Sequence, residues 1–127
     1  PRDLVVEIAD VRFNAELADT VEKRAQGLSG RHSLASDAAM WFDLGRQRHA
    51  SFVMRSMQFP LDIVWVDESL HVVHVTPNAP VPSEGARGGS QVRYSSGAPA
   101  RYVLEINAGL AQAHGIRPGM EVRVAPP

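Results

Sequence analysis

The spacing of apolar side chains predicts that most of this chain forms β-strands. Residues 4–8 and 11–17 are apolar at about every second position, the period of a strand with one buried face. Residues 61–66 are apolar on both faces except at Asp62, which is typical of a central strand covered on both sides. Shorter apolar runs predict the remaining strands, at residues 39–42, 51–56, 71–76, 101–108 and 120–124.

Two short segments have a helical pattern instead. A capping-box-like start at Asp19 and a following glycine delimit a predicted helix over residues 20–28. The second predicted helix covers about residues 108–114, with Asn107 as its N-terminal cap and Gly115 after its last turn.

These elements predict a mainly β fold, a compact antiparallel sandwich or barrel with two short helices, as a single domain over residues 1–127. A chain of this length buries roughly two-thirds of its unfolded surface, so it can fold without a metal or a disulfide. Residues 77–100 interrupt the pattern because they are rich in proline, glycine and serine. Two interpretations stay open for them: a functional or mobile loop, or a disordered or partly paired excursion.

The stretch SFVMRSMQFPLDIVWVD, residues 51–67, is mostly apolar, but Arg55 and Asp62 lie inside it. If residues 51–56 and 61–67 form an antiparallel hairpin, Arg55 faces Asp62 and apolar residues face each other along the ladder. Two interpretations of the charged pair remain. In the first, Arg55 and Asp62 neutralise each other's charge at the end of the hairpin. In the second, the pair lines the mouth of a pocket where Arg55 binds an anionic or hydroxylated ligand.

Three apolar residues near this pair are further candidates for ligand binding. Met57 and Phe59 lie in the predicted turn, where the core cannot easily enclose both, so we expect them to be exposed. Met54 belongs to the same group of methionines and aromatics, which suits an adaptable binding surface as well as a core. The predicted ligand-binding residues are therefore Arg55, Asp62, Met57, Phe59 and Met54.

Composition excludes several classes of function. Thirteen basic and fourteen acidic residues give a net charge of −1, so we expect no general nucleic-acid binding. The chain has no cysteine, which excludes thiol catalysis and thiolate metal sites. Its five histidines lack the spacing of a metal site, and His71 and His74 would point to opposite faces of a strand. We therefore predict no metal, no cofactor and, from the lack of a long apolar run, no integral membrane segment in this chain.

Four segments in order resemble a known prokaryotic family, domain of unknown function 192. They read DTVEKRAQGLSGR, AMWF, FVMRSMQFPLDIVWVD and RYVLEINAG. The resemblance implies a compact, mainly β fold and no established activity. It also implies a periplasmic or exported location, because members often carry an export signal, although a cytoplasmic location stays open. Where the family motif has a lysine this chain has Arg55, and it lacks the cysteines that many members carry near residues 77–85.

Three functions remain open from the sequence. The first is a non-catalytic domain that binds a small ligand or a partner protein through the surface around Arg55 and Asp62. The second is a hydrolase or lyase with Asp62 as general base and Arg55 or His49 positioning an anionic substrate. We rank it second because an ion pair with Arg55 would lower the pKa of Asp62 rather than raise it. The third is an assembly module that adds a strand from residues 77–100 to a partner's sheet.

Overall fold

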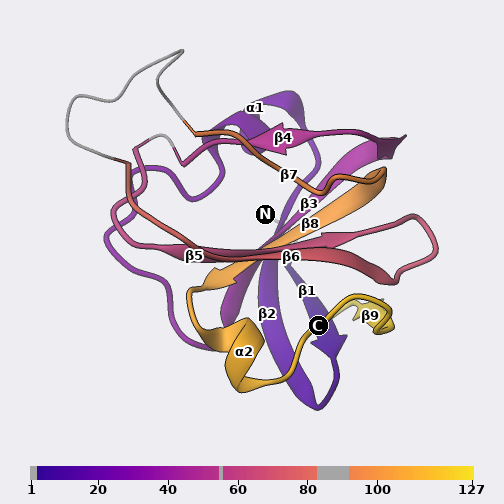
Figure 1. Ribbon diagram of the computed structural model, residues 1–127. Helices are drawn as coiled ribbons and strands as arrows, with labels where there is room; N and C mark the ends of the chain where they lie inside the picture. Colours follow the sequence, from indigo (N-terminus) through magenta and orange to yellow (C-terminus); the bar gives the residue numbers. More distant parts are fainter. Residues whose placement is uncertain (1–2, 55, 83–91) are drawn as a thin grey trace.

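The computed structural model describes residues 3–54, 56–82 and 92–127. Its main feature is a seven-stranded sheet in the order β6-β5-β8-β3-β2-β1-β9 (Figure 1). The strands of this sheet are β1 (Asp3–Ile8), β2 (Val11–Ala18), β3 (Ala38–Arg48), β5 (Leu61–Val66), β6 (Val72–Ala79), β8 (Ala100–Asn107) and β9 (Val122–Ala125). Neighbouring strands are antiparallel except β2 and β3, which are parallel. The predicted mainly β fold is confirmed.

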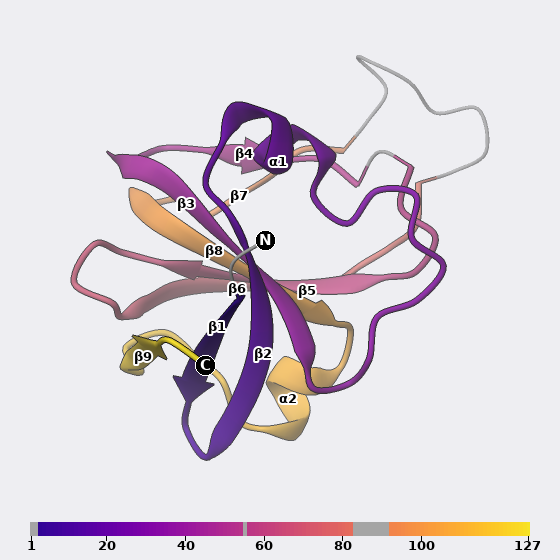
Figure 2. The same ribbon diagram turned by 180° about the vertical axis from the view of Figure 1, so that it is seen from behind.

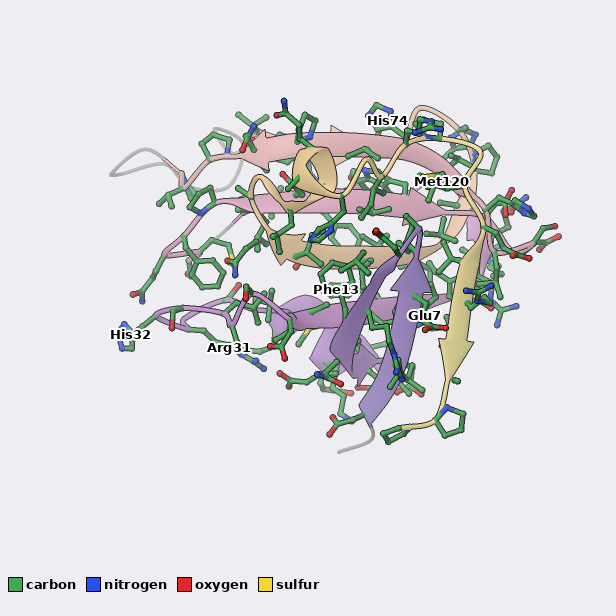
Figure 3. All side chains as sticks on the ribbon, turned by 90° about the horizontal axis from the view of Figure 1, so that it is seen from below. Glu7, Phe13, Arg31, His32, His74 and Met120 are labelled. Atoms are coloured by element: carbon green, nitrogen blue, oxygen red, sulfur yellow. The ribbon has the colours of Figure 1, made fainter. Side chains whose placement is uncertain are left out.

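The sheet curls into a half-barrel whose two edge strands meet at one end. The Val72 N–H donates to the carbonyl of Met120 at 2.9 Å, and the Val122 N–H donates to the carbonyl of Leu70 at 2.8 Å. The inner face encloses a core to which β1, β2, β3, β5 and β8 contribute, with Phe13 fully buried in it (Figure 3). Helix α2 (Leu110–Ala113) contributes Ala111 to this inner core.

A second core lies on the outer face of the same sheet. Helix α1 (Val21–Gln26) and a two-stranded sheet of β4 (Ser51–Phe52) and β7 (Tyr94–Ser95) cover this face. Figures 1 and 2 show this cover on the opposite side of β5 and β8 from α2. All six residues of β5 are buried, so the prediction of a strand covered on both sides is confirmed.

Helix α1 is shorter than its predicted range, and its cap is one residue later. Thr20, not Asp19, is the N-cap, because its hydroxyl accepts a hydrogen bond from the Lys23 N–H at 3.1 Å. Gly27 ends the helix with a positive φ of 50°, a conformation that glycine adopts readily. Both helices are only about one turn or two long, and the described part of the chain contains no helix capable of crossing a membrane.

The predicted cap of the second helix is wrong. Helix α2 begins after Gly109, its N-cap residue, which has no side chain to form a capping hydrogen bond. Asn107 is the last residue of β8, and its side-chain amide donates to the carbonyl of Leu34 at 2.5 Å. Asn107 therefore fixes the loop before β3 instead of starting the helix.

The predicted hairpin between residues 51–56 and 61–67 is also wrong. β5 pairs with β6 on one edge and with β8 on the other, so no edge of β5 is free for β4. β4 pairs instead with β7, with Phe52 opposite Tyr94. Arg55, the predicted partner of Asp62, lies outside the described residues.

Residues 77–100 are partly built into the two sheets. Residues 77–79 complete β6, and β7 lies near the end of the segment. Residues 83–91, the middle of the segment predicted as a loop or partner-binding strand, lie outside the described residues. The described ends of the segment therefore contribute to the sheet edge and to the cover over the outer face.

Candidate functional site

Asp62 is buried near the start of β5 and binds backbone groups of two distant segments. Its side chain is 1% exposed. One carboxylate oxygen accepts a hydrogen bond from the Asn78 N–H at 2.9 Å. The other accepts from the N–H groups of Gly109 at 3.0 Å and Ala111 at 2.9 Å. Asp62 thus supplies the cap that α2 lacks locally, because its charge satisfies N–H groups at the helix start.

These contacts give Asp62 a structural role and do not support its use as a general base. Both of its oxygens are engaged, and its burial keeps a substrate away in this conformation. The residue does lie on the same face as Val64 and Val66, as the sequence predicted, and that face is the inner core. The interpretation of Asp62 as part of a pocket mouth therefore finds no geometric basis in the described residues.

The predicted apolar candidates lie on the other face of the sheet. Met54 and Met57 are buried there, with exposed fractions of 3% and 6%, so the expectation that Met57 is exposed is wrong. A hydrogen bond from the Met57 N–H to the Met54 carbonyl at 3.1 Å folds this segment into a turn against the sheet. Phe59 is half-buried and packs on the same core. All three belong to the outer core rather than to an exposed contact.

Glu105 is a buried acid in β8 on this outer face. Its direct neighbours across the sheet are Met40 of β3 and Ile63 of β5, both buried and apolar. Its own exposed fraction is 5%. Among the described residues no side chain or backbone group forms a hydrogen bond or ion pair with its carboxyl. Burial raises the pKa of Glu105 from 4.5 to about 8, because the charged form loses its hydration.

Glu105 borders a small inner cavity of about 40 Å³. Leu28, Phe42, Met54 and Met57 contribute apolar walls to it, and α1 and the segment after it contribute the residues 24–29. This volume holds one or a few atoms of a polar group, or water, but not a whole organic ligand. At neutral pH the raised pKa keeps Glu105 mostly protonated, so the group can both donate and accept a hydrogen bond.

A larger outer cleft of about 470 Å³ adjoins the inner cavity. The two share four lining residues, Arg24, Ala25, Phe52 and Val53. The Phe52 ring is held edge-on against the rings of Phe42 and Trp65, with centroid distances of 5.0 and 5.4 Å. The volume of the outer cleft lies in the range of small-molecule sites, and its apolar wall is fixed by packed aromatic rings.

The described residues contain no group of three or more histidines and acids that could hold a metal ion. Two of the histidines illustrate why, because His32 lies on a loop at one side of the molecule and His74 at the other (Figure 3). His32 instead lies 3.0 Å from the side-chain oxygen of Gln58. His49 borders the outer cleft, where its charged neighbours are arginines.

Glu105 was not among the residues that the sequence singled out. The signal was present, because a glutamate between Leu104 and Ile106 interrupts a strand that is otherwise apolar on both sides. An acid in such a strand is rarely fully buried without a partner, which makes it a candidate for function. The absence of a partner, however, depends on which distant segments cover the strand, and the sequence pattern does not contain that information.

Comparisons with known proteins identify relatives but no activity. The sequence profile of the family domain of unknown function 192, described as "Uncharacterized ACR", matches residues 4–124. No curated protein matches the chain. A crystal structure of a protein of unknown function from Novosphingobium aromaticivorans is 32% identical, with a TM-score of 0.82 over 95% of this chain and 83% of that one. A Sinorhizobium meliloti protein described as a proposed transcription regulator is 28% identical, with a TM-score of 0.85 over 98% and 94% of the two chains.

Proposed function

Because this chain belongs to the uncharacterised family domain of unknown function 192, we propose a function from the site itself: the domain binds a small organic ligand in the outer cleft and recognises it through Glu105. The observation that supports this proposal most directly is the buried side chain of Glu105 at the inner cavity, whose carboxyl binds none of the described residues. The outer cleft takes the body of the ligand, and the inner cavity takes one hydrogen-bonding group.

The energetic cost of Glu105 supports this assignment. A carboxyl that is 5% exposed and binds none of the described residues destabilises a fold when it ionises, and an apolar side chain of similar size would lie between Met40 and Ile63 without that cost. A ligand group that hydrogen-bonds Glu105 removes the cost, and the low dielectric of the site strengthens that bond. The site therefore offers selective affinity for a ligand that reaches the inner cavity.

Binding fits the geometry better than catalysis. Asp62, the acid in our enzyme hypothesis, is occupied by three backbone N–H groups. Glu105 makes no hydrogen bond to a hydroxyl, imidazole or amine side chain among the described residues, as a catalytic acid paired with a nucleophile would. Among the described residues the site thus holds a recognition group that is not hydrogen-bonded to a nucleophile.

Two predictions made from the sequence are retained beside this function. A location in the cell envelope rests on the family resemblance alone. The absence of general nucleic-acid binding rests on the net charge of −1, and for that reason we do not extend the description of the Sinorhizobium protein to this chain. Partner proteins are not identified by the site.

The test is a fragment screen by protein-observed NMR on the wild-type chain and three variants. Ala25→Phe fills the shared wall of the cleft and cavity from an exposed position on α1. Val21→Phe is the matched control, because Val21 is 70% exposed on the same helix and borders neither space. Glu105→Gln keeps the size of the recognition group but changes its hydrogen bonding.

We expect bound fragments to shift the signals of Phe52 and Val53 in the wild type and in Val21→Phe. The same fragments should lose affinity in Ala25→Phe, and those that reach the inner cavity should change affinity in Glu105→Gln. If a diverse panel produces no shifts at the cleft, or the shifts survive in Ala25→Phe, the site does not bind small ligands and the proposal is wrong.

A further inference from the structure

The described ionisable side chains that border the outer cleft are all of basic types. Its described lining includes Arg24, Arg48 and His49 and no aspartate or glutamate. The whole chain has a net charge of −1, so this local excess of positive charge runs against the average of the molecule. A small cleft lined by charges of one sign concentrates ligands of the opposite sign.

The positive charges of the two arginines are not neutralised by neighbouring acids in the described part of the chain. Arg24 donates to the backbone carbonyl of Asp43 at 3.0 Å, a neutral acceptor that leaves the charge of the guanidinium in place. The carboxylate of Asp43 forms its ion pair with another arginine, because its Oδ1 atom lies 3.3 Å from the Arg101 guanidinium and also accepts from the Gly45 N–H at 2.8 Å. Arg48 is exposed and forms no ion pair among the described residues.

Apart from Ser51, the remaining described lining of the outer cleft is apolar. Leu44 and Phe52 contribute large hydrophobic side chains next to the arginines. The cleft thus places guanidinium groups, which suit carboxylate or phosphate oxygens, beside a surface that suits a hydrocarbon or aromatic body. Glu105 borders the inner cavity, which shares four lining residues with the cleft, and does not line the cleft itself.

We infer that the ligand of this site is a small organic anion, with its acidic group held by Arg24, Arg48 and His49 and its apolar body against Phe52. This inference rests on the proposed ligand-binding function and names the class of ligand. Glu105 does not oppose it, because burial raises the pKa of that carboxyl and keeps it mostly protonated at neutral pH.

The test compares three probes that share a phenyl ring on a four-carbon chain and end in an anionic, a neutral or a cationic group: 4-phenylbutyrate, 4-phenylbutyramide and 4-phenylbutylamine. Their dissociation constants are measured by NMR titration at neutral pH and low salt, for the wild type, Arg48→Gln and Arg46→Gln. Arg46 is the matched control, because it is an exposed arginine on the same strand that does not border the cleft.

We expect 4-phenylbutyrate to bind the wild type about ten-fold more tightly than the amide, since a charge-assisted hydrogen bond is stronger than a neutral one. Arg48→Gln should remove most of this preference, whereas Arg46→Gln should keep it. The preference should also fall when NaCl is added, because salt screens exposed charges.

Two results overturn the inference and differ in what they say of the proposed function. If the amide or the amine binds the wild type as tightly as the carboxylate, the site binds ligands but does not select anions. If none of the three probes binds at about 10 mM, where even weak fragments are detected, the anion class is wrong, and the fragment screen decides separately whether the cleft binds any ligand.

Discussion

Glu105 makes the stability of this protein depend on pH in an unusual direction. In the folded chain burial raises the pKa of Glu105 to about 8, whereas the ordinary value is 4.5. The folded state therefore holds the proton more tightly than the unfolded state. Its stabilising effect is fully present below pH 4.5, declines as the pH rises, and is lost above about pH 8.

The size of the effect follows from the difference between the two pKa values. One pKa unit corresponds to about 1.4 kcal/mol, so the free energy of unfolding should fall by about 4 to 5 kcal/mol between pH 4.5 and 8 through this one group. That is a large share of the roughly 5 to 15 kcal/mol that stabilises an ordinary domain. Glu105→Gln has no proton to lose and should lack this decline.

The assay is urea denaturation of wild type and Glu105→Gln at intervals from pH 5 to 9, with exposed Glu22→Gln as control. The difference in unfolding free energy between the first two proteins isolates Glu105, because their other titrating groups are the same. We expect Glu105→Gln to gain several kcal/mol relative to wild type as the pH rises, and Glu22→Gln to gain almost nothing. A difference that stays constant within about 1 kcal/mol over the whole range would refute an unpaired, buried carboxyl at this position.

Two further predictions concern the caps of the helices. Asp62→Asn should lower the free energy of unfolding by about 2 to 4 kcal/mol, because an amide cannot accept from all three backbone N–H groups at once. Urea denaturation measures this difference, and a loss below about 1 kcal/mol would contradict the structural role of Asp62. Thr20→Ala removes the cap of α1 and should lower the free energy of unfolding by about 0.5 to 2 kcal/mol in the same assay. Thr20→Ser keeps the hydroxyl and should lower it less. Equal losses in both variants would show that the hydroxyl does not act as a cap.

The elements that the sequence predicted well are those whose signal is local. Alternation of apolar and polar residues at 4–8 and 11–17 identified β1 and β2 and the break between them, because a strand with one buried face imposes that period on its own residues. The apolar residues of 61–66 identified β5 as central for the same reason. The two helices were found at the right places but predicted too long, since Gly27 ends α1 inside the predicted range and Asn107 is the last residue of β8 rather than the cap of α2.

The pairing of strands could not be predicted in the same way. Residues 51–56 and 61–67 matched each other in charge and hydrophobicity, and short hairpins are common. In the structure, however, β8 occupies one edge of β5 and β6 occupies the other, so no edge of β5 is left for the hairpin. β8 comes about forty residues later in the chain, so only competition among all strands decides the neighbours of β5.

The candidate site depended on the same distant arrangement. The basic residues of the sequence RQRHASFVMR were visible as a cluster, but nothing local showed that Arg48 and His49 meet α1 across a cleft. Asp62 was recognised as an unusual acid, yet its partners are backbone groups of residues 78, 109 and 111, which carry no side-chain signature. The sequence indicated the chemistry of each side chain, whereas the partners of that side chain required the fold.

Asp62 also has a consequence for the way this chain reaches its folded state. Helix α2 is only four residues long, so it has little stability by itself, and its cap comes from a residue 47 and 49 positions earlier than the N–H groups it binds. The same carboxylate holds Asn78, next to the end of β6. One side chain thus ties three segments together in a protein without disulfides, and we expect α2 and the end of β6 to become ordered only when β5 is in place, as one cooperative step.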